Sequence, residues 1–231
     1  MTARADAAQA GPPRRITQPQ RTSRRLSDEE RERRAQQRRD ATLARHRTRI
    51  LDAVSQCFAE RGYHDTSVDQ VVAQARSSKS AFYACFPNKE TAFAALLERE
   101  GERLLHAVEQ AVTAETQPRG RARAGISTFV THCADNQATA RILLVESVGI
   151  SPAIEEQRRA LHTRFAELIR AQAESARAAG TIATTLDLGV LAFALVGAVN
   201  EAVVHLIDSG GGDPAPVIEA LGHLAARALA P

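Results

Sequence analysis

The 231-residue chain is 44% hydrophobic, which is enough for one large or two small domains, and no run of 18 apolar residues predicts a membrane span. Its three cysteines are odd in number and widely spaced, which fits a reduced cytosolic compartment better than a disulfide framework. The net charge of +3 is unevenly distributed, because residues 1–49, the basic head, carry 14 arginines against six acidic residues. Such a basic segment indicates a polyanionic partner.

An Arg-rich N-terminal extension is predicted over residues 1–44. Within it, residues 1–26 show almost no apolar periodicity, so we expect them to be disordered. The pattern changes at Ser27, since Ser27 and Glu30 match a capping box. Residues 28–44 are therefore either a polar, solvent-exposed helix or a charged tail with only transient helicity.

A clear amphipathic helix begins at Arg47. Apolar residues recur at helical spacing from Ile50 to Phe58, which predicts one buried face. Gly62 follows at the position where a glycine commonly ends a helix.

Two short helices are predicted next, at residues 67–74 and 78–85, with a turn of about three residues between them. A capping box of Thr66 and Asp69 opens the first helix, and Pro87 ends the second. A longer helix flanks the pair on each side. This is the spacing of a helix-turn-helix, whose second helix enters the major groove of DNA by its N-terminal end.

The side chains of the second short helix have the chemistry of a DNA contact. Small residues permit close approach, Ala81 can meet a thymine methyl group, and Lys79 can reach a guanine edge or a phosphate. The Tyr83 hydroxyl and the capping residue Ser78 are typical phosphate contacts. Lys79 is one of only two lysines in a chain that has 28 arginines. Either these sites admit only the compact ammonium group, or the two lysines are placed by chance.

The rest of the chain is divided by Gly and Pro residues into further helices. A long helix capped by Asn88 comes first. No strand pattern or internal repeat is visible, so we predict an all-α protein. The helices implied after the long one are roughly 121–135, 138–148, 153–179, 186–208 and 214–229.

Residues 47–97 resemble the DNA-binding domain of TetR-family transcriptional regulators. The motifs that carry the resemblance are Gly62-Tyr63, Thr66-Ser67-Val68, Tyr83 with Phe86, and Asn88-Lys89-Glu90. The resemblance implies that bases and nearby backbone are contacted by Lys79, Ser80, Ala81 and Tyr83. It also implies that phosphates are held by Thr66, Ser67 and Lys89.

The predicted turn departs from the family pattern. Family members usually have Gly-Val there, whereas this chain has Arg76-Ser77. A non-glycine residue with positive φ is uncommon and costs about 1 kcal/mol. Either the turn geometry differs here, or Arg76 adopts that conformation and a phosphate contact compensates the cost.

The resemblance further implies two domains: a three-helix helix-turn-helix domain at residues 45–92 and a larger helical ligand-binding and dimerisation domain at residues 93–231. Homodimers would form through helices at about 186–208 and 214–229. Polar and aromatic residues on otherwise apolar helices are candidates for an effector pocket, and a surface or core role is the alternative for each. These candidates are His106, His132, Arg141, Glu146, Phe165, Asn200 and His205.

The function implied is that of a cytoplasmic, bacterial, homodimeric repressor that binds a palindromic operator in double-stranded DNA and is released by a small-molecule effector. One alternative is a basic protein that binds DNA without sequence preference or effector response. The other is an all-helical enzyme, but no phosphate-binding loop, HExxH or CxxC motif supports it. We therefore predict no catalytic residue, metal site, cofactor or membrane association.

Overall fold

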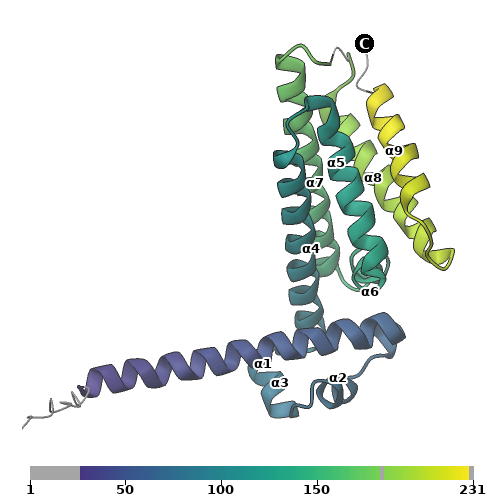
Figure 1. Cartoon of the computed structure of the whole chain (residues 1–231). Helices are drawn as coiled ribbons and strands as arrows, with labels where there is room; N and C mark the ends of the chain where they lie inside the picture. Colours follow the sequence, from purple (N-terminus) through teal and green to yellow (C-terminus); the bar gives the residue numbers. More distant parts are fainter. Residues whose placement is uncertain (1–26, 183–184, 229–231) are drawn as a thin grey trace, which may run out of the picture. The chain divides into compact units, whose positions relative to one another are not determined.

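The computed structural model describes residues 27–182 and 185–228, and no strand occurs in these ranges (Figure 1). The all-α prediction is therefore confirmed for the described residues, whereas the disorder expected of residues 1–26 lies outside them. The elements are α1 (Asp28–Asp65), α2 (Val68–Gln74), α3 (Lys79–Cys85), α4 (Lys89–Ala114), α5 (Pro118–Asp135), α6 (Gln137–Arg141), the π-helix η1 (Ile142–Glu146), α7 (Pro152–Ala178), α8 (Leu188–Asp208) and α9 (Ala215–Ala228).

The chain divides into two compact units, Met1–Ala41 and Thr42–Pro231. In the first unit, the capping box predicted at Ser27 is present, because the Ser27 N–H donates to Glu30 Oε2 at 3.0 Å and the Glu30 N–H donates to Ser27 Oγ at 3.2 Å. Of the two interpretations of residues 28–44, the helix is the one adopted.

In the second unit, α1 supplies one wall of a small hydrophobic core. Ile50, Val54 and Phe58 are fully buried, as their helical spacing predicts. Gly62 has φ of +78°, a conformation that favours glycine, and the regular helix breaks there. Helix α3 closes this core with Phe82 and with Phe86, the residue directly after its end, and both are buried.

The capping box expected of Thr66 and Asp69 is wrong by one residue. Ser67 is the N-cap of α2, and it shares the box with Gln70. Thr66 is buried, and its hydroxyl donates to the carbonyls of Cys57 at 3.1 Å and Gly62 at 2.8 Å. The hydroxyl is therefore used to satisfy carbonyl groups at the C-terminal end of α1, and the next residue performs the capping.

The larger part of the second unit is a bundle of α4, α5, α7, α8 and α9 (Figure 1). Helix α4 packs on α5, α7 packs on α8, and α5 packs on α9. The single helix expected at 138–148 is instead divided between α6 and η1. The π-helical turn ends beside the buried residue Ser147, whose hydroxyl donates to the Leu143 carbonyl at 2.9 Å.

Helix α8 is the most apolar part of the bundle. With 21 residues and a mean hydropathy of 2.0, it is long and apolar enough to cross a membrane by length and composition alone. It nevertheless packs on α5, α7 and α9, and Ala192, Val203 and Ile207 lie in the core. Its apolar character therefore has an explanation within the bundle.

Candidate DNA-reading surface and effector cavity

The exposed face of α3 presents the residues expected to read DNA. Ser78 caps this helix, since its hydroxyl accepts the Ala81 N–H at 3.1 Å. Lys79, Ser80 and Tyr83 are exposed, and Tyr83 keeps 53% of its surface accessible. Small and polar groups thus lie at the N-terminal end of a helix that is anchored from behind by buried phenylalanines.

The turn between α2 and α3 takes the conformation that the family pattern requires. Arg76 has φ of +46°, the one positive value among the described residues that are not glycine. The Ser77 N–H then donates to the Val72 carbonyl at 2.8 Å and closes the turn. Arg76 therefore adopts the unfavourable conformation, and its side chain is exposed at the same surface as α3.

Lys79 is tied to the preceding helix through an exposed ion pair. Its Nζ lies 2.7 Å from Asp69 Oδ1, with both side chains more than half exposed. The hydrogen bond to Asp69 raises the pKa of Lys79 above its usual value. The ammonium is accessible to an approaching phosphate or base, but that contact would compete with Asp69.

Lys89 lies in a different environment, at the start of α4. Its Nζ donates to the carbonyls of Tyr63 at 2.6 Å, Thr66 at 2.9 Å and His64 at 3.4 Å. The same nitrogen lies 4.2 Å from the centroid of the Tyr63 ring. Burial lowers the pKa of Lys89. A compact ammonium with three donors suits converging carbonyls, whereas a planar guanidinium does not.

Lys89 and Thr66 are therefore both occupied by backbone carbonyls within the protein. A phosphate contact by either residue stays a prediction, and it would have to compete with these bonds. Ser67 is exposed but serves as the N-cap of α2. Of the nine residues expected at DNA, six are exposed: Ser67, Arg76, Ser78, Lys79, Ser80 and Tyr83.

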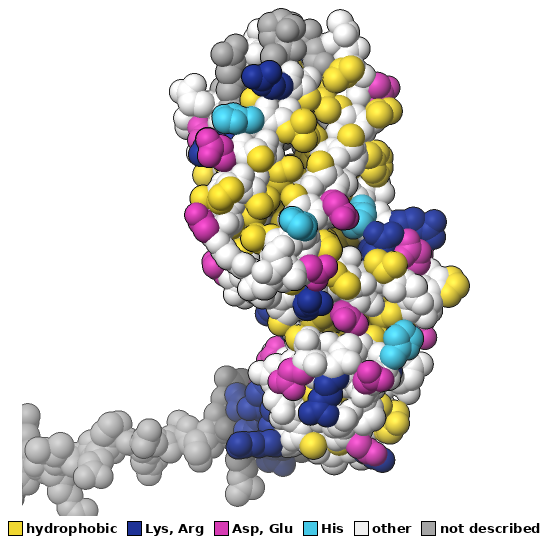
Figure 2. Space-filling view, turned by 90° about the vertical axis from the view of Figure 1, so that its right-hand side faces the viewer, with side chains coloured by type: hydrophobic (Ala, Val, Ile, Leu, Met, Phe, Trp, Pro, Cys, Tyr) yellow, Lys and Arg dark blue, Asp and Glu magenta, His cyan; other side chains and the backbone are white. Residues whose placement is uncertain are grey.

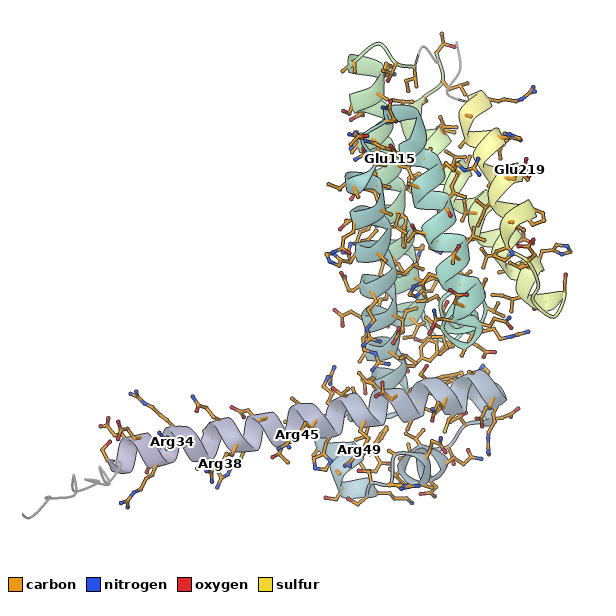
Figure 3. The ribbon with its side chains drawn as sticks, viewed as in Figure 1. Arg34, Arg38, Arg45, Arg49, Glu115 and Glu219 are labelled. Carbon is orange, nitrogen blue, oxygen red and sulfur yellow. The ribbon has the colours of Figure 1, made fainter. Side chains whose placement is uncertain are left out.

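Sequence reasoning missed Arg47 on α1. Its Nη1 donates to the Cys85 carbonyl at 3.3 Å, and its Cζ lies 4.5 Å from the centroid of the Phe86 ring. A cation at the C-terminal end of α3 is favourable for the helix dipole. Nothing in the spacing of Arg47 distinguishes it from its arginine neighbours, of which Arg45 and Arg49 are labelled in Figure 3.

A cavity of about 440 Å³ lies inside the bundle, bounded by α4, α5, α7, α8 and α9. Its walls are mostly aliphatic, and Phe129 and Phe165 meet there edge to face with ring centroids 5.5 Å apart. A concave, mainly apolar site with a few polar groups is typical of small-molecule binding. Polar groups at the wall come from Arg121, Arg123, Gln172, Thr181 and Asn200.

Two of the seven residues expected in an effector pocket line this cavity, namely Phe165 and Asn200. The other five lie elsewhere. Arg141 pairs with Asp208 at 3.2 Å, and Glu146 accepts a backbone N–H from Tyr63. The side chains that do not line it are His106, His132, Arg141, Glu146 and His205.

Arg121 is the half-buried cation of the cavity, and sequence reasoning missed it. Its Nε donates to the Glu115 carbonyl at 3.1 Å, and its Nη1 donates to Gln172 Oε1 at 3.2 Å. Glu115 lies at the turn between α4 and α5 (Figure 3). No carboxylate within the described ranges forms an ion pair with Arg121, so its charge is balanced only by dipoles.

A histidine lies beside the polar end of the cavity wall. Asn200 Nδ2 is 3.3 Å from Nε2 of His162, which is half-buried on α7. Burial lowers the pKa of His162, and the Arg158 cation lowers it further.

One face of the bundle exposes apolar side chains. Figure 2 shows hydrophobic side chains gathered on the bundle as seen from the α9 side. Val190 and Phe193 on α8 are 70% and 54% exposed, and Leu224 on α9 is 50% exposed. Exposed apolar patches of this kind often mark interaction surfaces.

Comparison with known proteins accounts for both parts of the chain. The family model for bacterial regulatory proteins of the tetR family matches residues 50–96. The model for the tetracyclin repressor-like C-terminal domain matches residues 115–229. The chain belongs to the TetR family.

Individual relatives agree with this assignment. The chain is 29% identical over 111 residues to the transcriptional activator FasR of Mycolicibacterium smegmatis. The aligned residues make up 48% of this chain and 51% of FasR. The chain thus spans about half the length of FasR, and 16% and 26% of two uncharacterised Bacillus subtilis regulators that it also matches.

Solved structures share the fold. FadR from Bacillus subtilis, crystallised in complex with stearoyl-CoA, superposes with a TM-score of 0.73 at 18% identity, covering 78% of this chain and 98% of FadR. A TetR-like regulator from Rhodococcus sp. RHA1 superposes with a TM-score of 0.66 at 27% identity, covering 80% and 95%.

The two lysines of the chain serve as a matched pair in a test of the Lys89 environment. Lys89→Arg keeps the positive charge, but its planar guanidinium cannot donate to all three carbonyls that surround Nζ. We therefore expect it to lower the free energy of unfolding by about 1–3 kcal/mol. Lys79→Arg changes an exposed ion pair and should change that free energy by less than about 0.5 kcal/mol. Urea unfolding followed by circular dichroism measures both. Equal effects of the two substitutions would contradict the assigned role of Lys89.

Proposed function

We propose that the protein is a cytoplasmic transcriptional regulator that binds a palindromic operator in DNA as a homodimer. The observation that carries the proposal is the exposed N-terminal end of α3, with Lys79, Ser80 and Tyr83 accessible. One helix-turn-helix contacts few base pairs, and a two-fold dimer doubles the site at half-sites about 34–36 Å apart. Membership of the TetR family supports this function.

The dimer is proposed to form through α8 and α9. Val190, Phe193 and Leu224 on these helices are exposed, and burial of such side chains drives association. Gly197 is exposed on the same helix, and nothing lies within 4 Å of a Cβ placed there. This surface therefore leaves room for a close helix approach.

The effector is proposed to be an amphiphile with an apolar chain and an anionic end. The aliphatic walls of the cavity suit the chain, and Arg121 suits the anion because no carboxylate in the described part of the protein neutralises it. The stearoyl-CoA bound by the structurally similar FadR supports the same class.

Effector binding is proposed to release the operator, which makes the protein a repressor. The cavity is bounded by α4, whose first turn lies directly after the helix-turn-helix, and a shift of this helix would alter the position of α3. FasR is named an activator, so activation is the alternative to repression. A reporter-gene measurement with and without effector distinguishes the two.

Non-specific DNA binding is the second candidate, and the basic head of residues 1–49 favours it. The two candidates differ in their preference among sequences. A regulator prefers its operator over random duplex by about 10³-fold or more, whereas a non-specific protein shows no preference.

Operator binding is tested by fluorescence anisotropy on DNA immediately upstream of the protein's own gene, with random duplex as competitor. We expect a preference of at least about 10³-fold that Lys79→Ala lowers by roughly 10-fold or more. Arg159→Ala, which removes the same charge from an exposed position on α7, is the control and should change nothing. Equal affinity for all duplexes would favour the non-specific candidate.

The effector class is tested by calorimetric titration with stearate, stearoyl-CoA and the neutral octadecanol. We expect the two anions to bind more tightly than the alcohol and Arg121→Gln to weaken them by about 10- to 100-fold. Arg123→Gln removes a charge from an exposed residue of the same wall and is the matched control. Tight binding of octadecanol, or equal losses in both variants, would contradict the anionic assignment.

A further inference from the structure

Several contacts join the bundle to the helix-turn-helix, among them the Arg99–Asp52 ion pair at 2.8 Å, and one of them is a carboxylate that bonds to the backbone just before α2. Glu146, the last residue of η1, accepts the backbone N–H of Tyr63 on Oε2 at 3.2 Å. Tyr63 lies in the last turn of α1, directly after the break at Gly62 and 83 residues earlier in the chain. A bond from a charged acceptor to a half-buried backbone donor is among the stronger hydrogen bonds in proteins.

Gly62 is required at this contact for two independent reasons. Its φ of +78° favours glycine, and a Cβ placed there would lie 3.2 Å from Glu146 Oε2. A side chain at position 62 would therefore be strained by its φ and would press on the carboxylate, which would have to move by a few tenths of an ångström. A close approach of this kind indicates that the contact is built into the local conformation of the chain.

Both backbone polar groups of Tyr63 are bonded to side chains. Glu146 accepts its N–H, while Lys89 donates to its carbonyl at 2.6 Å. The Tyr63 ring packs against Phe58 and Phe93, with centroids 5.5 and 5.3 Å away. Because Ser67 opens α2 only four residues later, the position of Tyr63 sets the start of the α2–α3 pair.

Glu146 is presented by an irregular element. The π-helical turn η1 follows α6 directly, and a return to α-helical spacing would shift the register by one residue, a rotation of about 100°. That rotation would withdraw Glu146 from Tyr63. On the other side, Arg141 at the end of α6 pairs with Asp208 at the end of α8, the helix whose first half lines the cavity.

We propose that Glu146 is a positioning residue by which the effector domain helps to set the orientation of α2 and α3. Glu146 acts through the Tyr63 peptide, and the π-helical register of η1 keeps its carboxylate in place. The structural part of this assignment depends only on the contacts described, whereas its consequence for operator affinity rests on the proposed function.

The test is hydrogen–deuterium exchange of the free, full-length protein, read by mass spectrometry. In Glu146→Ala we expect the amides of residues 62–86 to exchange about 10- to 100-fold faster than in the wild type, while α8 and α9 keep their protection. Glu146→Gln retains an acceptor oxygen and should restore most of the protection. Glu98→Ala removes the same charge from an exposed position on α4 and is the control.

Two outcomes would overturn the proposal. Unchanged exchange at residues 62–86 in Glu146→Ala would mean that the carboxylate does not hold the reading helices. Faster exchange of the reading helices and of α8 and α9 alike would mean that Glu146 supports general stability and does not position one domain.

DNA binding by the same variants separates this inference from the proposed function. Glu146→Ala should lower affinity for the upstream DNA by about 10-fold or more, and Glu146→Gln should recover it. If the wild type shows no preference for that DNA, the proposed function fails at this site, and the exchange measurement still decides the role of Glu146.

Discussion

The helix-turn-helix depends on how the backbone of Tyr63 is held. Lys89 donates to its carbonyl, Glu146 accepts its N–H, and three carbonyls in all converge on the Lys89 ammonium. A helix that breaks at a glycine leaves several carbonyls without partners, and their desolvation is costly unless a donor replaces them. Lys89 and the Thr66 hydroxyl supply those donors, so the start of α2 is fixed without regular secondary structure.

The effector bundle combines two demands on the same helices. Helix α8 lines the cavity with one side and exposes Val190 and Phe193 with another, so it is apolar nearly all round. Apolar side chains gain free energy when they are removed from water, so both sides of α8 are favourable places for contacts. Its composition is therefore consistent with both a dimer contact and an apolar effector, and this explains why it also passes a membrane-span criterion.

Much of the fold was predictable, because each helix is marked by local signals. The apolar spacing of Ile50, Val54 and Phe58 and the caps at Ser78 and Asn88 are encoded within a few residues. The long-range contacts were not predictable from pattern. Arg121 lines the cavity, whereas Glu146 lies outside it and bonds to Tyr63. Both positions result from how α5 and η1 pack, and no local spacing distinguishes these residues from solvated ones. The capping prediction at Thr66 was wrong for the same reason, since its hydroxyl bonds to α1.

The claim that Lys89 and Glu146 together hold the backbone of Tyr63 is tested most directly by a double-mutant cycle. The free energy of unfolding would be measured for the wild type, Lys89→Met, Glu146→Ala and the double variant. Because both side chains hold the backbone of the same residue, Tyr63, the account predicts effects that fail to add by about 0.5–3 kcal/mol. Effects that add within about 0.3 kcal/mol would show that the two contacts are independent, and they would contradict the account.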